Sequence, residues 1–495
     1  AVCDGATIDV QFEESPASSF VLPTDKVVTI RGISSLPTQT GNILADGTPP
    51  GTRLERLEPD TSVGYGLLAL NGAQVIADDL VFFGGRGLQA QSPGTEVICT
   101  DCIFDQNNAV FGSSVFASNS AKLVLNRATV SDATSSNDAA VYANNGAELE
   151  IYDSEFTTNE LTNAGEAATG LAVRSADLIL ERTSFTGHIS GDRQPTILLS
   201  GFATSHQLTD VKLVDNDGGV WITGSAQVDL TGLVAYRNGG KITAEREGAV
   251  EVRNGGNIVT LYNAELAAND GPGLNISPTD PTSTVDVGWS TFVGNGEAGI
   301  AYTAAGGLTV NYSVFNFHTS DIAGPNLMSL TGPQENWYEH ATSVFDHCAT
   351  VYPAVCYSGD PQFLTFHPNL QSDRWVLRPE GQAGPLWNGA GNIFGAGDPF
   401  SIIGHSGGPL GDAMQWYADD GDGVRDGWEL FWHGTTDNDG EDDVDGDGVD
   451  ELTEYNRGTS PIHQDTDEDT YPDDCEELFG TNPQNPLSFP LSQCP

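Results

Sequence analysis

The chain of 495 residues is strongly acidic: 69 aspartates and glutamates face 19 lysines and arginines, and the formal net charge at pH 7 is −50. Such a surface repels nucleic acids and anionic membranes, which excludes both as partners, and it attracts cations. No apolar run is long enough to span a membrane. The sequence begins at AVCDG without a charged and apolar leader, as expected for a secreted protein whose signal peptide has been removed.

Seven cysteines favour an oxidising compartment. Cys99 and Cys102 are expected to be buried small apolar residues rather than a bonded pair. Cys3 is left over, as either a free thiol or an intermolecular link. Two local disulfides are candidates, Cys348 with Cys356 and Cys475 with Cys494.

An eight-residue pattern recurs from residue 28 to about residue 318, with copies about 26 residues apart. Apolar residues occupy its first, third and eighth positions, and a small or apolar residue occupies the sixth. The alternation predicts a strand with one side facing inward, and the wider gap before the sixth position predicts a corner. The copies are VTIRGISS (28–35), VIADDLVF (75–82), VICTDCIF (97–104), LVLNRATV (123–130), LEIYDSEF (149–156), LILERTSF (178–185), HQLTDVKL (206–213), VDLTGLVA (228–235), VTLYNAEL (259–266), VDVGWSTF (285–292) and LTVNYSVF (308–315).

Asparagine lies three residues beyond the last apolar position in six of these copies. Asparagine tolerates the left-handed backbone conformation of a sharp corner, and stacked asparagine side chains hydrogen-bond along a coil axis. The repeat resembles the right-handed parallel β-helix of the pectate lyase-like superfamily. The resemblance implies an all-β solenoid of about 11 coils over residues 1–318, and it implies a fold rather than an activity. The six are Asn107, Asn159, Asn216, Asn238, Asn269 and Asn295.

The fifth position of each copy faces outward and is predicted to hold neighbouring coils in register. Acids and bases alternate there through Asp101, Arg127, Asp153, Arg182 and Asp210. With coils ~4.8 Å apart, each exposed pair contributes ~0 to 1 kcal/mol, and together the pairs oppose a slip of one coil. We therefore interpret the two arginines as structural rather than as the base of a polysaccharide lyase.

No active site is recognised in the repeat, and no catalytic residue is assigned. A polysaccharide lyase needs a base beside carboxylate-held Ca²⁺, and a glycoside hydrolase needs two carboxylates that flank the scissile bond. Asp78 and Asp79 are adjacent but fall at a predicted corner. Trp289 and Tyr312, on adjacent coils, are the candidates for contact with a glycan. The chain is expected not to be an enzyme.

Between residues 319 and 411 the repeat fades into a segment rich in proline, glycine and tryptophan. Its GDPQF run and the later Trp-Val-Leu-Arg-Pro turn resemble the closing coils of bacterial secreted β-helix proteins. Because a solenoid end exposes unpaired backbone groups, we expect this segment to be a cap. The alternative is a docking surface for a neighbouring subunit.

Residues 412–495 contain three acidic loops in one frame, each followed by a short helical segment that ends at a glycine. Carboxylates at positions 1, 3, 5, 9 and 12 with glycine at position 6 match the oxygen ligands of an EF-type Ca²⁺ loop. The second loop is complete, whereas Thr470 replaces the glycine of the third and Ala418 occupies position 1 of the first. The module resembles thrombospondin type 3-like and dockerin-like repeats, which implies Ca²⁺ as cofactor. The predicted ligands are Asp420, Asp422, Asp426 and Glu429, then Asp443, Asp445, Asp447, Glu451 and Glu454, then Asp465, Asp467, Asp469, Asp473 and Glu476.

These features predict a secreted, non-enzymatic structural protein of the cell surface or extracellular matrix. It would be a calcium-stabilised rod that binds copies of itself, in a filament or layer, or another surface protein. A polysaccharide-binding or polysaccharide-degrading β-helix protein and an adhesin are the alternatives.

Overall fold

The computed structural model describes most of residues 3–316 and short segments beyond them. Its two compact units, Ala1–Gly359 and Asp360–Pro495, are treated separately. Gaps in the first range are 11–19, 34–37, 63, 110–111, 163–166, 191–193, 240–247, 268, 277–282, 289, 294, 296–297, 303–306 and 312. Described beyond it are 320–323, 330–334, 336–338, 356–358, 443–444, 446, 448–450, 452–454, 464, 471–472, 474–475, 479 and 481.

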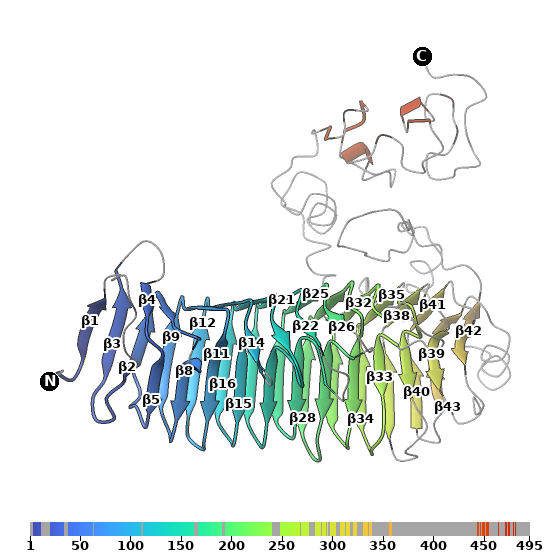
Figure 1. Cartoon of the computed structure of the whole chain (residues 1–495). Helices are drawn as coiled ribbons and strands as arrows, with labels where there is room; N and C mark the ends of the chain where they lie inside the picture. The colour runs from blue at the N-terminus through green and yellow to red at the C-terminus, as the bar shows by residue number, and fades with distance from the viewer. Residues whose placement is uncertain are drawn as a thin grey trace, which may run out of the picture. The chain divides into compact units, whose positions relative to one another are not determined.

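The first unit is a parallel β-solenoid, which agrees with the predicted fold class (Figure 1). In each coil a strand of sheet A leads through a corner to a strand of sheet D, and the chain then passes to sheet B before the next coil begins. Sheet A orders its strands as β1 (Ala6–Val10), β3 (Val28–Gly32), β6 (Thr52–Glu55), β9 (Gln74–Asp78), β12 (Glu96–Thr100), β16 (Lys122–Asn126), β20 (Glu148–Tyr152), β24 (Asp177–Glu181), β28 (Ser205–Thr209), β31 (Gln227–Thr231), β34 (Ile258–Tyr262), β37 (Thr284–Gly288), β40 (Gly307–Asn311) and β43 (Leu330–Gln334).

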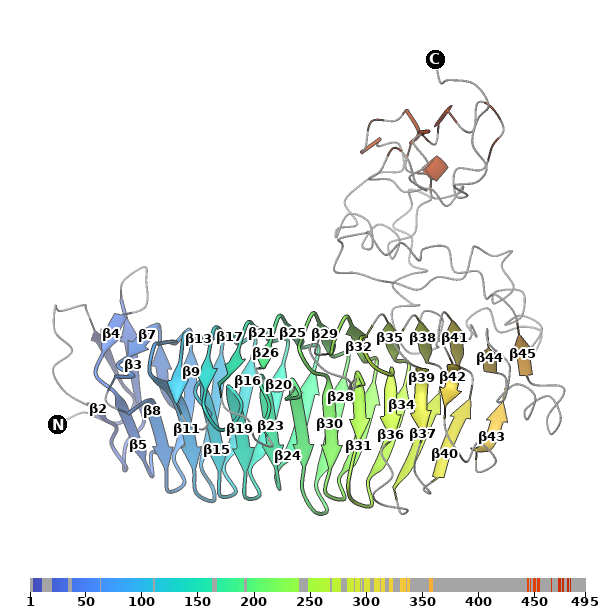
Figure 2. The ribbon, with the colours of Figure 1, turned by 45° about the vertical axis from the view of Figure 1, so that its right-hand side comes forward.

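Sheets B and D form the other faces of the coil (Figure 2). Sheet D contains β10 (Val81–Phe83), β13 (Ile103–Asp105), β17 (Thr129–Ser131), β21 (Glu155–Thr157), β25 (Ser184–Thr186), β29 (Lys212–Val214), β32 (Val234–Tyr236), β35 (Glu265–Ala267), β38 (Thr291–Val293), β41 (Val314–Asn316), β44 (Asn336–Tyr338) and β45 (Cys356–Ser358). Sheet B contains β2 (Phe20–Val21), β5 (Ile43–Asp46), β8 (Tyr65–Leu70), β11 (Arg86–Gln91), β15 (Val115–Ser118), β19 (Val141–Asn144), β23 (Leu171–Arg174), β27 (Ile197–Ser200), β30 (Val220–Thr223), β33 (Val250–Val252), β36 (Leu274–Ile276), β39 (Ala298–Tyr302) and β42 (Ser320–Ala323).

Two smaller sheets join these faces. Sheet E contains β14 (Asn108–Ala109), β18 (Thr134–Ser135), β22 (Glu160–Leu161) and β26 (Ile189–Ser190), and sheet C contains β4 (Thr38–Thr40) and β7 (Leu57–Pro59).

Each of the eleven predicted copies supplies one strand of sheet A, and the predicted inward positions are buried. In the copy at 75–82, Val75, Ala77, Leu80 and Phe82 are at most 2% exposed. Equivalent residues stack between coils, as where the rings of Phe82 and Phe104 lie 4.8 Å apart. The core is therefore a continuous column along the coil axis.

The repeat pattern misses β6, although this strand pairs in register with β9. Thr52 takes the first inward position of its copy, and Pro59 takes the last. Because a threonine and a proline occupy the first and last inward positions, a search for the repeat of apolar residues does not find this copy. β1 and β43 likewise extend sheet A beyond the predicted copies.

The predicted outward ladder lies at the corner between sheets A and D. The guanidinium of Arg127 lies 2.7 Å from the carboxylate of Asp101, and that of Arg182 lies 2.6 Å from that of Asp153. These four residues all have φ between +48° and +54°. The structure thus confirms two pairs of the predicted ladder and places them on left-handed corner residues.

The second corner carries the predicted asparagine ladder, in which Asn216, Asn238, Asn269 and Asn295 bond side chain to side chain at 2.8–3.1 Å. The expectation that asparagine itself takes the left-handed conformation was wrong. The left-handed residue is the one before it, such as Asp215 at φ +56°. The asparagine points into the coil to reach backbone groups, so its outward neighbour makes the turn.

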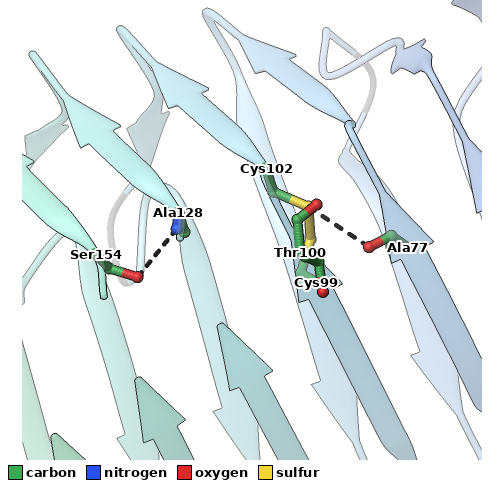
Figure 3. The surroundings of a disulfide bond; sticks show 6 residues. All are labelled: Ala77, Cys99, Thr100, Cys102, Ala128 and Ser154. Atoms are coloured by element: carbon green, nitrogen blue, oxygen red, sulfur yellow. Dashed lines mark hydrogen bonds between the residues drawn. A yellow bond between two sulfur atoms is a disulfide. The ribbon is translucent and has the colours of Figure 1, made fainter. Parts of the chain in front are cut away.

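Cys99 and Cys102 are buried, as expected, but they form a disulfide, which corrects the expectation that they are unpaired. They lie on either side of the left-handed Asp101, so both side chains turn into the coil at one corner. Figure 3 shows that the position of Cys102 is occupied by Ala128 and Ser154 in the next two coils, where the Ser154 hydroxyl accepts the Ala128 N–H.

In the second unit, helical backbone is described at 452–454 and 474–475. No helix among the described residues is both long and apolar enough to cross a membrane. The predicted division at residues 318 and 411 stays a prediction, and the middle segment with its histidines lies almost wholly outside the described residues.

Candidate functional sites

The second acidic loop is the part of the predicted calcium module in which ligand side chains are described. Asp443, at position 1, accepts the N–H of Gly446 at 2.8 Å and the N–H of Gly448 at 3.1 Å. Gly448 has a φ of +95°, which only glycine adopts readily, and it stands at position 6. The loop is therefore wrapped around the carboxylate at its first position.

The end of this loop starts a helical turn. The Asp450 carboxylate accepts the Thr453 N–H at 2.8 Å, which is the bonding of a helix N-cap. The Glu454 N–H donates to the Asp450 carbonyl at 2.9 Å. Glu454, at position 12, is fully buried. Sequence reasoning missed the cap at Asp450, although an aspartate at the start of a helical segment is its usual signal.

A carboxylate at position 1 that accepts two loop N–H groups and a buried carboxylate at position 12 are compatible with the two ends of a calcium loop. Within the part of the chain that the structure describes, no group of three or more histidine, cysteine, aspartate or glutamate side chains is close enough to hold a metal. Outside the described residues lie the predicted ligands Asp420, Asp422, Asp426, Glu429, Asp445, Asp447, Glu451, Asp465, Asp467, Asp469, Asp473 and Glu476.

The other predicted site residues are only partly described. Trp289, Tyr312, Cys348 and Cys494 lie outside the described residues, and Cys356 begins β45. Cys475 is disulfide-bonded. The pairings of Cys348 with Cys356 and of Cys475 with Cys494 stay predictions, as does glycan contact at Trp289 and Tyr312.

A second site, which sequence reasoning did not find, lies on the outer face of sheet B. One outward position of successive strands forms what we call the sheet B row. Apolar members of this row cluster with Ala139 and Ala168; all of them are buried except Phe116, which is partly buried. Strands such as VYAN and VWIT have apolar residues on both faces, which is the sequence signal of a sheet covered on both sides. In register, the row is Phe116, Tyr142, Ala172, Leu198, Trp221, Glu251 and Asn275.

Asp138 is buried at one end of the row, four residues before Tyr142. Burial raises the pKa of its carboxyl to about 6, against the opposing effect of Arg174 on the next coil. Their charged groups lie 3.5 Å apart. The Tyr142 hydroxyl, which accepts the side-chain amide of Asn144 at 3.1 Å, has its pKa raised by burial as well.

Glu251 is buried at the other end of the row. Its carboxylate accepts the Arg253 guanidinium at 3.0 Å, the Gly248 N–H at 2.8 Å and the Asn275 amide at 3.0 Å. The same guanidinium lies over the ring of Trp221 at 3.4 Å from its centroid. A charge held by this many partners is fixed in place and serves to anchor the strand end rather than to transfer protons.

The spacing of these two carboxyls decides what they can do. Asp138 and Glu251 are separated by four strand spacings, or about 19 Å along the axis. Two-carboxylate glycoside hydrolysis needs about 5 to 9.5 Å. Asp138 and Glu251 therefore cannot act as a catalytic pair. Asp78 and Asp79 do not form one either, because Asp78 pairs with Arg53 and Asp79 makes the left-handed corner.

One family model agrees with the fold of the first unit. This family model, described as right handed beta helix region, matches residues 139–329. That part of the chain, about two fifths of it, is therefore similar to the right-handed β-helix family. A search of curated proteins found no match.

Solved structures similar to the β-helix include three catalytic units of GH87 α-1,3-glucanases. One, from Streptomyces thermodiastaticus strain HF3-3, has 11% identity and a TM-score of 0.37, with 72% of this chain and 61% of that chain covered. Another was solved with tetrasaccharides and a third with nigerose; both have 11% identity and cover 66% of this chain and 62% of theirs, with TM-scores of 0.36 and 0.34. The chain thus spans about three fifths of the length of these neighbours.

Proposed function

We propose that the protein is a secreted, non-enzymatic structural protein, a β-helical rod with a calcium-ordered C-terminal module. It acts at the cell surface or in an extracellular layer, where it associates with copies of itself or with another surface protein.

The observation that carries this proposal is the use of arginine in the described coils. Seven arginines form ion pairs, and six of them reach a carboxylate on a neighbouring coil. The chain has few basic residues, and most of its described arginines form ion pairs that connect neighbouring coils. Such contacts stabilise the stacking of coils that a rod requires. The six are Arg31, Arg53, Arg127, Arg174, Arg182 and Arg237.

The second acidic loop supports calcium as the cofactor. Asp443 is preorganised by two backbone N–H groups, and Glu454 is a buried carboxylate in a chain of net charge −50. A divalent cation would offset the cost of burying that charge, and extracellular Ca²⁺ at millimolar concentration fills even weak sites. The buried Cys99–Cys102 disulfide supports a secreted protein, because disulfides persist in oxidising compartments.

Particle size tests the proposal. Light scattering and electron microscopy would be applied to the full chain with Ca²⁺ and then with a chelator, beside a calorimetric Ca²⁺ titration. Filaments or sheets that dissolve on chelation are the expected result. A chain that binds no Ca²⁺, or a monomer under both conditions, would contradict the calcium-dependent assembly, and the monomer would favour an adhesin.

Glycan binding is the second candidate function, and the sheet B row favours it. The rings of Phe116 and Tyr142 stack with centroids 5.5 Å apart on adjacent coils, and Trp221 follows three coils beyond Tyr142. Tyr142 and Trp221 are each 8% exposed and Arg253 covers the Trp221 ring, so Phe116 is the aromatic side chain of this row that a sugar ring could reach. A panel of neutral and sulfated glycans tests it: binding that Phe116→Ala weakens would support this function, and no binding and no depolymerisation across the panel would remove it.

A further inference from the structure

Two histidines occur between residues 3 and 316, and the β-helix buries both of them in neighbouring coils. His188 follows β25 in the coil that begins with β24. His206 lies in β28 and pairs with Leu178 of β24, one coil back. The other described coils of sheet A carry no histidine at these positions.

His188 takes the place of an asparagine in the ladder. Its Nδ1 accepts the N–H of Asn159 on the coil before at 3.2 Å, as the asparagine side-chain oxygens do in other coils. The backbone N–H of His188 donates to the side-chain oxygen of Asn216 on the following coil at 3.0 Å. The imidazole therefore connects two coils only while Nδ1 carries no proton.

Protonation of His188 reverses this contact. The imidazolium would direct an Nδ1–H at the Asn159 N–H, and two donors cannot share a bond. Nε2, which is buried and has no hydrogen-bond partner, would remain a donor in an apolar surrounding. In the imidazolium, Nδ1–H would face another donor and Nε2–H would have no acceptor. Because such a buried cation is costly, protonation favours separation of the coils over the intact ladder.

His206 is also buried, in the next coil. Its Nε2 lies 3.1 Å from the Thr204 hydroxyl, and its buried Nδ1 has no hydrogen-bond partner. The neighbours in register are the inward Leu178 and Val228. An added proton on this ring would place a charge in the apolar column of the coil.

Few charges are near enough to compensate. Asp177 acts on His206, and its carboxylate already accepts the Ser205 N–H. Beside His188, Asp217 accepts the Ser190 N–H. Burial lowers the pKa of both imidazoles to about 4.

We propose that His188 and His206 form an acid-sensitive joint, at which protonation of either buried imidazole opens the coils from β24 to β31 while the distant coils stay folded. A solenoid allows this because each coil contacts only its neighbours, so one region can open without the rest. The proposal is independent of the calcium module.

Hydrogen exchange by mass spectrometry on the full chain tests the joint. Protection factors would be compared between pH 7.5 and 4.5 for residues 177–231, with residues 96–126 as the internal control. The open state binds protons below about pH 6.5 and the closed state only below about pH 4, so opening should become about tenfold more frequent per pH unit for each histidine involved. The control coils should keep their protection.

The variant His188→Asn restores an asparagine to the ladder, and His206→Gln keeps a polar contact to Thr204 without a titratable ring. The double variant should lose the acid-dependent opening of residues 177–231. If that chain does not fold at pH 7.5, His188→Asn alone is tested. Its opening frequency should then rise with falling pH by a factor that is about tenfold smaller per pH unit than in the wild type. Equal acid sensitivity in wild type and variant, or a loss of protection that is uniform over all coils, would overturn the proposal.

Discussion

Arg127 and Asp101 occupy the same corner of adjacent coils, both in left-handed backbone conformations, and the guanidinium donates two hydrogen bonds of 2.7 Å to the carboxylate. The pair holds the pKa of Asp101 below its usual range through those hydrogen bonds. A left-handed conformation costs an arginine about 1 to 2 kcal/mol, and an exposed ion pair returns ~0.2 to 1 kcal/mol. The corner thus combines backbone strain with a contact that sets the register.

This balance predicts opposite results for two substitutions of Arg127. Arg127→Ala removes the ion pair and keeps the strain, so the free energy of unfolding should fall by up to about 1 kcal/mol. Arg127→Gly removes both, and should leave the chain about 1 kcal/mol more stable than the alanine variant. Chemical denaturation of the β-helix measures the difference. Equal stabilities for the two variants would mean that the corner is not strained.

Asn238 is predicted to be among the most sensitive positions of the asparagine ladder. Its side chain donates to Asn269 and to the Leu213 carbonyl, and its side-chain oxygen accepts both the side-chain amide and the backbone N–H of Asn216. Asn238→Ala would remove these four buried bonds and leave the Asn216 backbone N–H without its acceptor. We expect a loss of about 2 to 4 kcal/mol, from about 1 to 3 kcal/mol per unsatisfied group.

Asn107 is the matched control for Asn238, because it holds one long bond of 3.4 Å to the Phe82 carbonyl and its side-chain oxygen has no partner. Asn107→Ala should cost less than half as much in thermal or chemical denaturation. Equal losses of unfolding free energy for Asn238→Ala and Asn107→Ala would show that packing of the side chains, and not their hydrogen bonds, stabilises the ladder.

The cysteines predict a distinct pattern of chemical labelling. Among Cys3, Cys99 and Cys102, only Cys3 is free and exposed. An alkylating reagent should modify Cys3 in the native chain, and a reductant should expose Cys99 and Cys102 only after unfolding, because both are fully buried. Mass spectrometry of the labelled peptides measures this pattern directly.

The replacement of Cys99 and Cys102 by alanine should lower the free energy of unfolding by about 2 kcal/mol, because the disulfide closes a very short loop.

Asp138 predicts a component of stability that falls as pH rises. Its folded pKa of about 6 lies above its ordinary value of 3.8, so the unfolded chain loses this proton first. The contribution of Asp138 to the free energy of unfolding is greatest below about pH 4, decreases between about pH 4 and pH 6, and is constant above that. The total change is about 3 kcal/mol, because each unit of pKa shift corresponds to about 1.4 kcal/mol.

The variant Asp138→Asn isolates that component, because the buried histidines titrate alike in both chains and cancel. The difference in unfolding free energy, wild type minus variant, should decrease by about 3 kcal/mol between pH 4 and pH 7. A difference that rises with pH would mean that Arg174 dominates over burial.

The second acidic loop predicts that Glu454 is required for calcium. Glu454→Gln keeps the shape of the side chain and removes the charge at position 12, so Ca²⁺ affinity in calorimetry should fall by tenfold or more. Asp450→Asn is the matched control, because asparagine also caps a helix and position 8 is not a predicted ligand. Equal losses in both variants would assign Glu454 a packing role.

The sequence alone was sufficient for the architecture. In a solenoid, equivalent residues of successive copies become spatial neighbours, so a one-dimensional repeat predicts inward residues such as Phe82, register pairs such as Asp101 and Arg127, and the stacking of Asn216 on Asn238. The acidic loops stay a prediction, which the sequence could make because the proposed ligands of each loop lie within twelve residues of one another.

Only the tertiary structure decided the rest. It showed that Asp215, and not Asn216, makes the turn, that Thr52 is a buried member of the repeat, and that Cys99 and Cys102 are bonded across a corner. It also placed Asp138 beside Arg174 and His188 beneath Asn159. These contacts depend on where a side chain points at a corner and on what covers the outer face of a sheet. Neither is recorded in the spacing of apolar residues, because that spacing reports only which residues face the core.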